Sequence, residues 1–508
     1  MLAKIKSYGL YGLEGFMVTV EVDVSSGLTA CDIVGLPDAA VRESRERVRA
    51  AIKNSGYTFP IGRITVNLAP ADRKKEGSIY DLAIALGILA ATEQIPHELP
   101  EYIYIGELAL DGSVRSVNGL LPMVISAYAE GRDTFMVPMD NAKETSYIDG
   151  VTAYGVSSLR EAAAFLRGLE TIEPQQKRKW NPKRINYSSD FSEIRGQYAA
   201  KRAAEIAAAG GHNMLLVGTP GSGKTMLARS MPSILPELTF DEALEITKIH
   251  SITGAMTGDE GIAAERPFRS PHHNASTAAL VGGGQKAQPG EISMAHCGVL
   301  FLDEFPEFQK DVLEALRQPL EDGMVSVTRA SFKATYPADF MLIAAMNPCP
   351  CGYFGSRVQE CRCKPHEVTR YRGRISGPML DRIDMHVEMA EVGYSDITSK
   401  SPGESSAAIR ERVDAARRIQ RQRYRDEGII SNSQLTSRLV KKYCKMEEKA
   451  ESLMKQAYTR LNFSARAYNR IMKVARTIAD LEASEIITSA HMAEAIQYRT
   501  VDKKYWGD

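Results

Sequence analysis

The stretch Met214-Leu-Leu-Val-Gly-Thr-Pro-Gly-Ser-Gly-Lys-Thr225 decides the fold of this sequence. Its apolar start predicts a buried strand, which leads into the pattern G-x-x-x-x-G-K-T and then into helix-forming residues. In that context the glycines let backbone N–H groups surround phosphates, Lys224 reaches the β- and γ-phosphates, and the Thr225 hydroxyl holds Mg²⁺. The predicted ATP- or GTP-binding residues are therefore Gly218, Thr219, Pro220, Gly221, Ser222, Gly223, Lys224 and Thr225.

Two more apolar runs end in polar residues that would complete a nucleotide site. Residues 299–302 run into Asp303 and Glu304, and residues 341–346 run into Asn347. In a parallel sheet the carboxyl ends of strands meet at one edge, where ligands bind. Asp303 is predicted to order the Mg²⁺ shell, Glu304 to polarise the attacking water, and Asn347 to hold the water or the γ-phosphate. The structural alternatives are a solvated acidic turn and an amide that caps a loop.

Composition limits the class of protein. The chain has 508 residues, 63 Lys and Arg against 63 Asp and Glu, 44% apolar residues and 7 cysteines. These values exclude disordered and fibrous classes, and at about 150 residues per domain the length predicts about three domains. The longest apolar run, residues 82–91, is too short to cross a bilayer, so no membrane partner is expected. The N-terminus shows no leader pattern, which predicts a cytoplasmic protein with reduced cysteines.

The first part of the chain, residues 1–170, is predicted to be an α+β domain. Alternating apolar residues predict strands at 16–22 and 64–68 and a further strand at 102–110. Helices are predicted at 38–55 and 81–91 from their apolar faces and stop signals.

The rest of the chain is predicted to hold two linkers and two domains. The basic residues and prolines of 171–190 predict a solvated linker, with a nucleic-acid contact as the alternative. The nucleotide motifs fall in 191–392, and a polar stretch at 393–406 predicts a second linker. Residues 407–508 are predicted to be helical, because apolar residues recur at helical spacing from Ala467 to Leu481.

Four of the seven cysteines lie in one short stretch, at 349–363. Cys349 and Cys351 form one C-x-C pair, and Cys361 and Cys363 form a second pair nine residues later. Four thiolates are a ligand set for tetrahedral Zn²⁺, and a metal would order a loop that has few apolar side chains. Because C-x-C is tighter than the commoner C-x₂-C, reduced or redox-labile thiols remain the alternative.

The order of these motifs resembles AAA+ ATPases. The segments that resemble the magnesium-chelatase-like branch of that class are Pro267–His273, Val281–Gly284, Pro289–Ser293 and Ala345–Cys349, and the full layout is similar to the ComM/YifB family. The resemblance implies an α/β fold, a P-loop AAA+ module whose parallel sheet has helices on both faces. An α+β Lon-protease-like (S5-like) domain would precede this module, and an all-helical lid would follow it.

The same resemblance implies a homo-oligomeric ring, expected to be a hexamer, with ATP sites between subunits. Arg382, in Leu380-Asp-Arg-Ile-Asp384, matches the family's arginine finger, which reaches the neighbour's γ-phosphate. Arg466, in Ser464-Ala-Arg-Ala-Tyr468, matches the lid arginine called sensor 2. Both would neutralise charge on the transferring phosphoryl group. From the residues alone, either arginine could instead form a surface ion pair.

The first domain lacks the catalytic pair of the Lon proteases that it resembles. That family needs a nucleophilic Ser activated by a Lys. When Lys75-Glu-Gly77 is aligned with the family's Lys-Asp-Gly, Ile79 takes the place of the Ser, and Leu121 takes the place of the Lys. Ser78 is one residue early. The sequence therefore predicts a Lon-like fold without peptidase activity.

Basic residues at two places are candidate DNA contacts. Residues 324–337 are predicted to form a hairpin with a basic tip at Arg329 and Lys333, and in the family such hairpins line the ring pore. Arg370 and Arg372 flank Tyr371 in a basic segment, a pattern that suits phosphate and stacking contacts. Solvated surface charges are the alternative at both places. An inserted loop and helix is also implied at 269–288, and the adjacent His272 and His273 are not expected to bind metal.

These features together indicate an ATP-driven ring motor on DNA, similar to the family in promoting branch migration as a helicase during recombination of incoming DNA. The cofactors are predicted to be ATP and Mg²⁺, with Zn²⁺ in the cysteine loop. The alternatives are a magnesium-chelatase-type motor subunit and an ATP-dependent protein remodeller. The sequence leaves open the type of DNA, the polarity of translocation and the size of the ring.

Overall fold

The computed structural model describes residues 1–181, 187, 189–255, 261–284, 287–329, 332–391, 393 and 403–506, without the side chains of Arg329, Phe332 and Lys503. The chain forms two compact units. The first contains residues 1–182, 240–264 and 328–335, and the second contains residues 183–239, 265–327 and 336–508. Among the described residues, no helix is long and apolar enough to cross a membrane.

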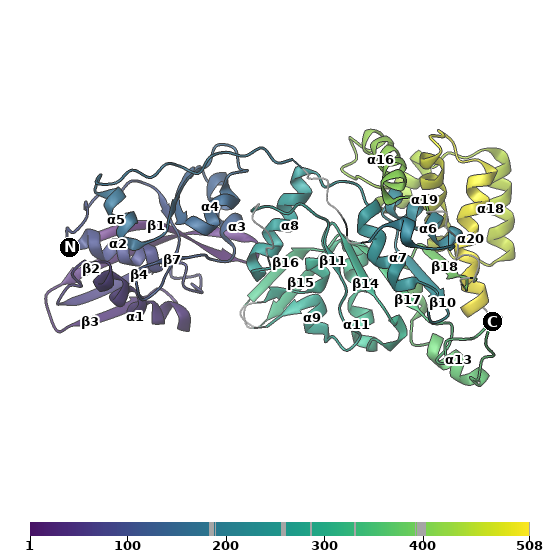
Figure 1. Ribbon diagram of the computed structural model, residues 1–508, viewed down its shortest axis with the longest axis horizontal. Coiled ribbons are helices and arrows are strands. Elements are labelled where there is room, and N and C mark those ends of the chain that lie inside the picture. Colours follow the sequence, from purple (N-terminus) through teal and green to yellow (C-terminus); the bar gives the residue numbers. More distant parts are fainter. Residues whose placement is uncertain are drawn as a thin grey trace. The chain divides into compact units, whose positions relative to one another are not determined.

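A seven-stranded sheet in the order β3-β4-β2-β1-β5-β8-β9 is the centre of the first unit (Figure 1). Its strands are β1 (Leu2–Tyr11), β2 (Glu14–Ser25), β3 (Ala30–Val34), β4 (Arg63–Ala69), β5 (Ile103–Tyr104), β8 (Thr134–Pro138) and β9 (Thr152–Val156). The alternation that predicted β2 is present, because Val18, Val20 and Val22 are fully buried. The helices of this unit are α1 (Ala39–Asn54), α2 (Asp81–Ala91), α3 (Leu120–Ala129), α4 (Met139–Thr145), α5 (Leu159–Leu166) and α8 (Phe240–Thr253).

The single strand expected at 102–110 is two short strands instead. After β5 the chain leaves the large sheet, and β6 (Glu107–Leu108) pairs with β7 (Val114–Arg115). The break occurs at Gly106, whose N–H donates to Ile79 O and whose carbonyl accepts from the Leu82 N–H, at 2.9 and 3.0 Å. These bonds take the place of the strand-to-strand hydrogen bonds that would have continued β5, so the predicted strand was too long.

The second unit contains a five-stranded parallel sheet in the order β11-β14-β17-β10-β18 (Figure 1). Its strands are β10 (Met214–Gly218), β11 (Phe268–Arg269), β14 (Val299–Leu302), β17 (Met341–Met346) and β18 (Met385–Met389). Every residue of β14 and β17 is buried, as expected of continuous apolar runs inside a parallel sheet. Hairpins form from β12 (Gly282–Gly283) with β13 (Gln288–Pro289), and from β15 (Met324–Arg329) with β16 (Phe332–Pro337).

Helices surround this sheet and continue into the C-terminal region. Those near the sheet are α6 (Tyr198–Gly210), α7 (Lys224–Ser230), α9 (Thr277–Val281), α10 (Glu291–Met294), α11 (Lys310–Ala315), α12 (Arg317–Asp322), α13 (Pro365–Arg372) and α14 (Gly377–Leu380). The C-terminal helices are α16 (Ser406–Arg423), α17 (Ser437–Tyr443), α18 (Glu448–Arg460), α19 (Ala465–Leu481) and α20 (Ser489–Trp506). One apolar cluster includes Leu216 of the sheet, Ala207 of α6 and Val474 of α19, so sheet and C-terminal helices share a core.

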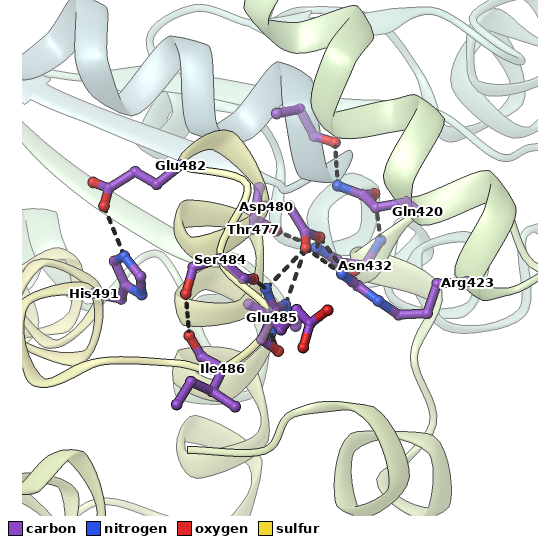
Figure 2. Close-up of polar contacts among 12 residues, drawn as sticks. Gln420, Arg423, Asn432, Thr477, Asp480, Glu482, Ser484, Glu485, Ile486 and His491 are labelled. Carbon is purple, nitrogen blue, oxygen red and sulfur yellow. Dashed lines mark hydrogen bonds and ion pairs between the residues drawn. The ribbon is translucent and has the colours of Figure 1, made fainter. Parts of the chain in front are cut away.

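A buried polar network fixes α19 against α16. Asp480 accepts hydrogen bonds from Arg423 at 2.5 and 3.0 Å, from Asn432 at 2.8 Å and from Arg476 at 3.1 Å (Figure 2). The Arg476 side chain is fully buried and also donates to the Glu485 carbonyl at 2.8 Å. The bonds from Arg423 and Asn432 join α16 and the segment after it to Asp480, so this network ties α19 to α16.

Candidate nucleotide site

The P-loop joins β10 to α7 and has the backbone that its glycines allow. Gly221 and Gly223 have φ values of +79° and +91°, which side chains rarely adopt. The Ser222 N–H donates to the Thr219 carbonyl at 3.2 Å, which closes the turn. The Ser222 hydroxyl is buried and has no hydrogen-bond partner among the described residues. The loop therefore contains a buried hydroxyl whose hydrogen bond could be completed by a bound polar ligand.

Lys224 lies inside this loop. Its ammonium donates to the carbonyls of Gly218 and Thr219 at 2.7 and 2.9 Å, and to Asn347 Oδ1 at 3.1 Å. Burial lowers the pKa of Lys224 to about 8, and the Asp303 carboxylate only partly offsets this. The structure thus brings together the P-loop lysine and the amide at the end of β17.

The end of β14 contributes two carboxylates to the same edge. The Thr225 hydroxyl donates to Asp303 Oδ2 at 2.8 Å, so the two oxygens expected to share a Mg²⁺ shell are neighbours. Glu304 follows with a left-handed backbone, φ +52°, and its side chain is 57% exposed. Because the Glu304 carboxylate is this exposed to solvent, it can contact a water molecule. The chemistry of these side chains fits the expected ligands. The oxygens of Thr225 and Asp303 suit Mg²⁺, and Lys224 and Asn347 suit the phosphates of a nucleoside triphosphate.

Two residues at this edge were missed by sequence reasoning. His273 Nδ1 lies 2.9 Å from Glu304 Oε2, although the histidine pair was considered only as a metal ligand. Gln197 has φ +55°, and its side-chain amide donates to the carbonyls of Ser222 at 3.0 Å and Ala390 at 2.6 Å. No spacing pattern in the sequence signals either contact, because each depends on loops that meet only in the folded chain.

The two candidate arginines lie in different environments. Arg382 is 7% exposed and its guanidinium contacts Glu321 at 2.5 Å, the Pro378 carbonyl at 2.7 Å and the Arg317 carbonyl at 3.3 Å. Arg466 is exposed in the first turn of α19. Within one chain, therefore, neither side chain is bonded to the P-loop residues by a contact that the structure describes.

The four cysteines of the 349–363 loop converge. Their sulfur atoms all lie within 4.8 Å of one another. Cys349 Sγ is 3.4 Å from Cys351 Sγ and 3.7 Å from Cys361 Sγ, and the Cys351–Cys361 distance is 3.6 Å. Four sulfurs at about 2.3 Å from Zn²⁺ in a tetrahedron stand about 3.8 Å apart. The cluster therefore has nearly the dimensions of a Cys₄ zinc site.

The basic residues proposed to contact DNA differ in their exposure to solvent. Lys333 in β16 and Arg370 in α13 are exposed, while the side chain of Arg329 lies outside the described residues. The position of Arg372 does not suit the expected contact with DNA. Arg372 is buried, donates to the carbonyls of Pro348 and Tyr505 at 3.0 Å each, and packs on aromatic rings. Its Nη2 has no hydrogen-bond partner among the described residues, but it is buried and so is closed to a phosphate at the surface.

In the first unit, the positions aligned with a Lon catalytic pair are apolar. Ile79 is half-buried and packs against the apolar core, and Leu121 is buried. Ser78 donates to the Glu107 carboxylate, and the fully buried Lys75 donates to the backbone carbonyls of Pro70 and Arg73. The nearby Ser and Lys are thus each bound to other partners.

Comparison with known proteins gives matches along nearly the whole chain. The family models that match are magnesium chelatase, subunit ChlI, over residues 190–397; subunit ChlI of Mg-chelatase, over 20–141; and magnesium chelatase, subunit ChlI C-terminal, over 403–499. The 67 kDa magnesium-chelatase subunit of Chlorobaculum parvum is 30% identical over 164 residues, 31% of this chain and 23% of that protein.

Relatives that match over nearly their full lengths include the following two. The YifB protein of Escherichia coli strain K12 is 44% identical over 505 residues, which cover 99% of this chain and 98% of YifB. The competence protein ComM of Haemophilus influenzae is 42% identical over 506 residues, covering 98% of each chain. With the parallel sheet, the P-loop and the helical C-terminal region described above, the chain belongs to the YifB/ComM family of magnesium-chelatase-like AAA+ proteins.

Proposed function

We propose that this protein is an ATP-hydrolysing AAA+ ring motor that acts on DNA as a helicase and promotes branch migration. The observation that carries the ATPase part is the meeting of Lys224, Thr225, Asp303, Glu304 and Asn347 at one edge of the parallel sheet. Lys224 and Thr225 would bind the phosphates and Mg²⁺, and Glu304 would accept a proton from the attacking water. In a homo-hexamer, Arg466 would stabilise the charge of the transferring phosphoryl group, and so would Arg382 once it is released from its contact with Glu321.

DNA as the partner is supported by the relation to ComM, a competence protein, and by the exposed cation Lys333 next to the tip of the β15–β16 hairpin. Lys333 and Arg370, with Arg329, are the proposed contacts to DNA phosphates. Such contacts position a strand and make binding depend on salt concentration. Arg372 is not among them, since it is occupied inside the protein.

The test is conversion of a fluorescently labelled four-way DNA junction into its two forked products, with ATP and Mg²⁺. We expect conversion by the wild-type chain and none by Glu304→Gln, which keeps the phosphate-binding residues. Lys333→Ala should slow conversion and weaken junction binding. The matched control is Lys455→Ala, which removes another exposed lysine, from α18. Equal slowing by both lysine variants would contradict a specific contact at Lys333.

A chelatase-type motor is the second candidate, because the matching family models are named for a magnesium-chelatase subunit. Its signature would be ATP-dependent insertion of Mg²⁺ into a porphyrin when the partner subunits of a chelatase are added. Activity in that assay, with no response to DNA, would favour this candidate over a DNA motor.

We also propose that Cys349, Cys351, Cys361 and Cys363 bind one Zn²⁺. The support is that the sulfurs of Cys349, Cys351 and Cys361 lie 3.4 to 3.7 Å apart and that all four sulfurs lie within 4.8 Å of one another, so a tetrahedral ion could bridge them. Elemental analysis of the purified protein should find one zinc per chain, and Cys361→Ser with Cys363→Ser should remove it.

A further inference from the structure

The cysteine loop contacts the P-loop at two points, one on each side of its first cysteine pair. Asn347, two residues before Cys349, accepts a hydrogen bond from Lys224 at 3.1 Å. Gly352, one residue after Cys351, lies against Pro220. A Cβ atom placed on Gly352 would be 2.6 and 2.7 Å from Pro220 Cγ and Cδ. Cys349 and Cys351 therefore lie between two residues that contact the phosphate-binding loop.

This segment is irregular and its middle is open to solvent, although Ser356 donates a hydrogen bond to Glu391. Among residues 347–364 the structure contains no helix or strand, and residues 357–360 are all exposed. Cys349 is buried, and the Gly352 N–H donates to its carbonyl at 3.0 Å, which closes a turn around the first cysteine pair. Ordering a polar loop that has no core of its own costs backbone entropy, and a cross-link such as a bound metal ion would offset that cost.

Arg372 connects the same loop to the C-terminal helix. Its guanidinium donates to the Pro348 carbonyl and stacks 4.4 Å from the Phe354 ring centroid on the loop side. On the other side it donates to the Tyr505 carbonyl and lies 4.9 Å from that ring centroid. The loop is thus held by Arg372 at Pro348 and Phe354, and the described contacts that join its second cysteine pair to its first are those of the sulfur cluster.

We propose that the four-cysteine loop is a metal-dependent support for the P-loop, so that loading of the Cys₄ site increases the affinity for ATP. This inference rests on the proposed nucleotide and zinc sites and adds a coupling between them. Zinc would hold Cys361 and Cys363 to Cys349 and Cys351, and thereby keep Asn347 and Gly352 against Lys224 and Pro220. Without the ion the loop would populate other conformations, and ATP would bind only the fraction that keeps these contacts.

The glycines of the loop provide a test that leaves the cysteines intact. Gly352 and Gly355 have similar positive φ values, +89° and +79°, so replacing either with Ala imposes a similar backbone strain. A Cβ on Gly352 collides with Pro220, whereas one on Gly355 has no atom within 4 Å. Gly355→Ala is therefore the matched control for Gly352→Ala.

The experiment measures zinc content by elemental analysis and the Kd for fluorescent mant-ATP by anisotropy, using the full-length chain grown with added zinc. We expect Gly352→Ala to keep one zinc and to bind mant-ATP at least fivefold more weakly, while Gly355→Ala matches the wild type. Cys361→Ser with Cys363→Ser should lose zinc and weaken binding about tenfold, with unchanged circular dichroism. Variants are used because a chelator would also remove Mg²⁺.

The outcomes separate this inference from the proposed sites. Equal mant-ATP affinity for Gly352→Ala and Gly355→Ala, or wild-type affinity in the folded zinc-free double variant, would overturn the coupling and leave both sites standing. A wild-type chain that binds mant-ATP but contains no metal would overturn the zinc site and the coupling. A wild-type chain that contains zinc and binds no nucleotide would instead overturn the proposed ATPase.

Discussion

The imidazole of His273 is within hydrogen-bond distance of the Glu304 carboxylate, with 2.9 Å between Nδ1 and Oε2. His273 comes from the segment between β11 and α9, and Glu304 from the end of β14. The rest of the Glu304 carboxylate is open to solvent. Among the described contacts, the imidazole of His273 is the group that orients it. We therefore expect His273 to position the proposed general base.

His273→Ala should lower the kcat of ATP hydrolysis about tenfold, because a base that rotates freely is less often aligned with its water. The KM for ATP should stay unchanged, since Lys224 and Thr225 keep their contacts. His273→Asn restores a side-chain N–H donor near the position of Nδ1 and should recover most of the rate. Steady-state kinetics of the three proteins checks this. Equal rates for the alanine and asparagine variants would contradict the positioning role.

Nucleotide binding should depend on pH through Lys224. Its pKa in the empty site is lowered to about 8, so above pH 8 the ammonium loses its proton and its attraction for phosphate. ATP should then bind together with a proton, and its Kd should rise about tenfold per pH unit above pH 8 while staying level between pH 7 and 8. Titrations of mant-ATP into Glu304→Gln, which cannot hydrolyse it, measure this. A constant Kd up to pH 9.5 would be evidence against it.

The first unit should lose stability as the pH rises from 4.5 to 7. Burial raises the pKa of Glu144 from 4.5 to about 7, although Asn141, the Leu121 backbone and Ser251 donate to its carboxylate. The folded chain thus binds a proton that the unfolded chain releases, and up to about 3 kcal/mol of stability is lost across this window. Glu144→Gln does not titrate. We expect the melting temperature of the wild type, relative to Glu144→Gln, to fall by several degrees between pH 5 and pH 8. A constant difference would refute this.

Asp384→Asn should destabilise the second unit by about 3–5 kcal/mol. Burial acts to raise the pKa of Asp384, but Arg470 and His212 outweigh it and hold the pKa far below its usual value. The substitution would leave the ion-paired Arg470 and the half-buried Lys473 without their counter-charge. Chemical unfolding followed by circular dichroism measures the loss. The control is Asp381→Asn, whose side chain is 34% exposed and lies 3.8 Å from Arg499, and which should cost less than about 1 kcal/mol.

Local sequence patterns were enough to predict which residues meet at the candidate nucleotide site, because each of them follows a strand at a fixed offset. The apolar runs before Gly218, Asp303 and Asn347 predicted β10, β14 and β17, and the parallel sheet then brings their ends together. The same reasoning located the four cysteines, whose spacing allows their sulfurs to meet.

Contacts between loops could not be predicted in this way. Arg372 shares its sequence environment with the exposed Arg370, and the packing of α20 and of Phe354 against it explains why it is buried. His273 and Gln197 likewise act across loops that no periodicity relates. The strand expected at 102–110 was wrong because the hydrogen bonds of Gly106 go to another part of the chain. Each miss reflects tertiary packing, which single-sequence patterns do not encode.

The central claim is that ATP hydrolysis drives a motor on DNA, and the ATPase rate measured with and without DNA tests it most directly. Single-stranded, duplex and four-way-junction DNA are compared, with Glu304→Gln as the inactive control. The account predicts a rate stimulated most by the junction, weakened by added salt and absent in Glu304→Gln. A wild-type rate that is the same with every DNA and with none would contradict it.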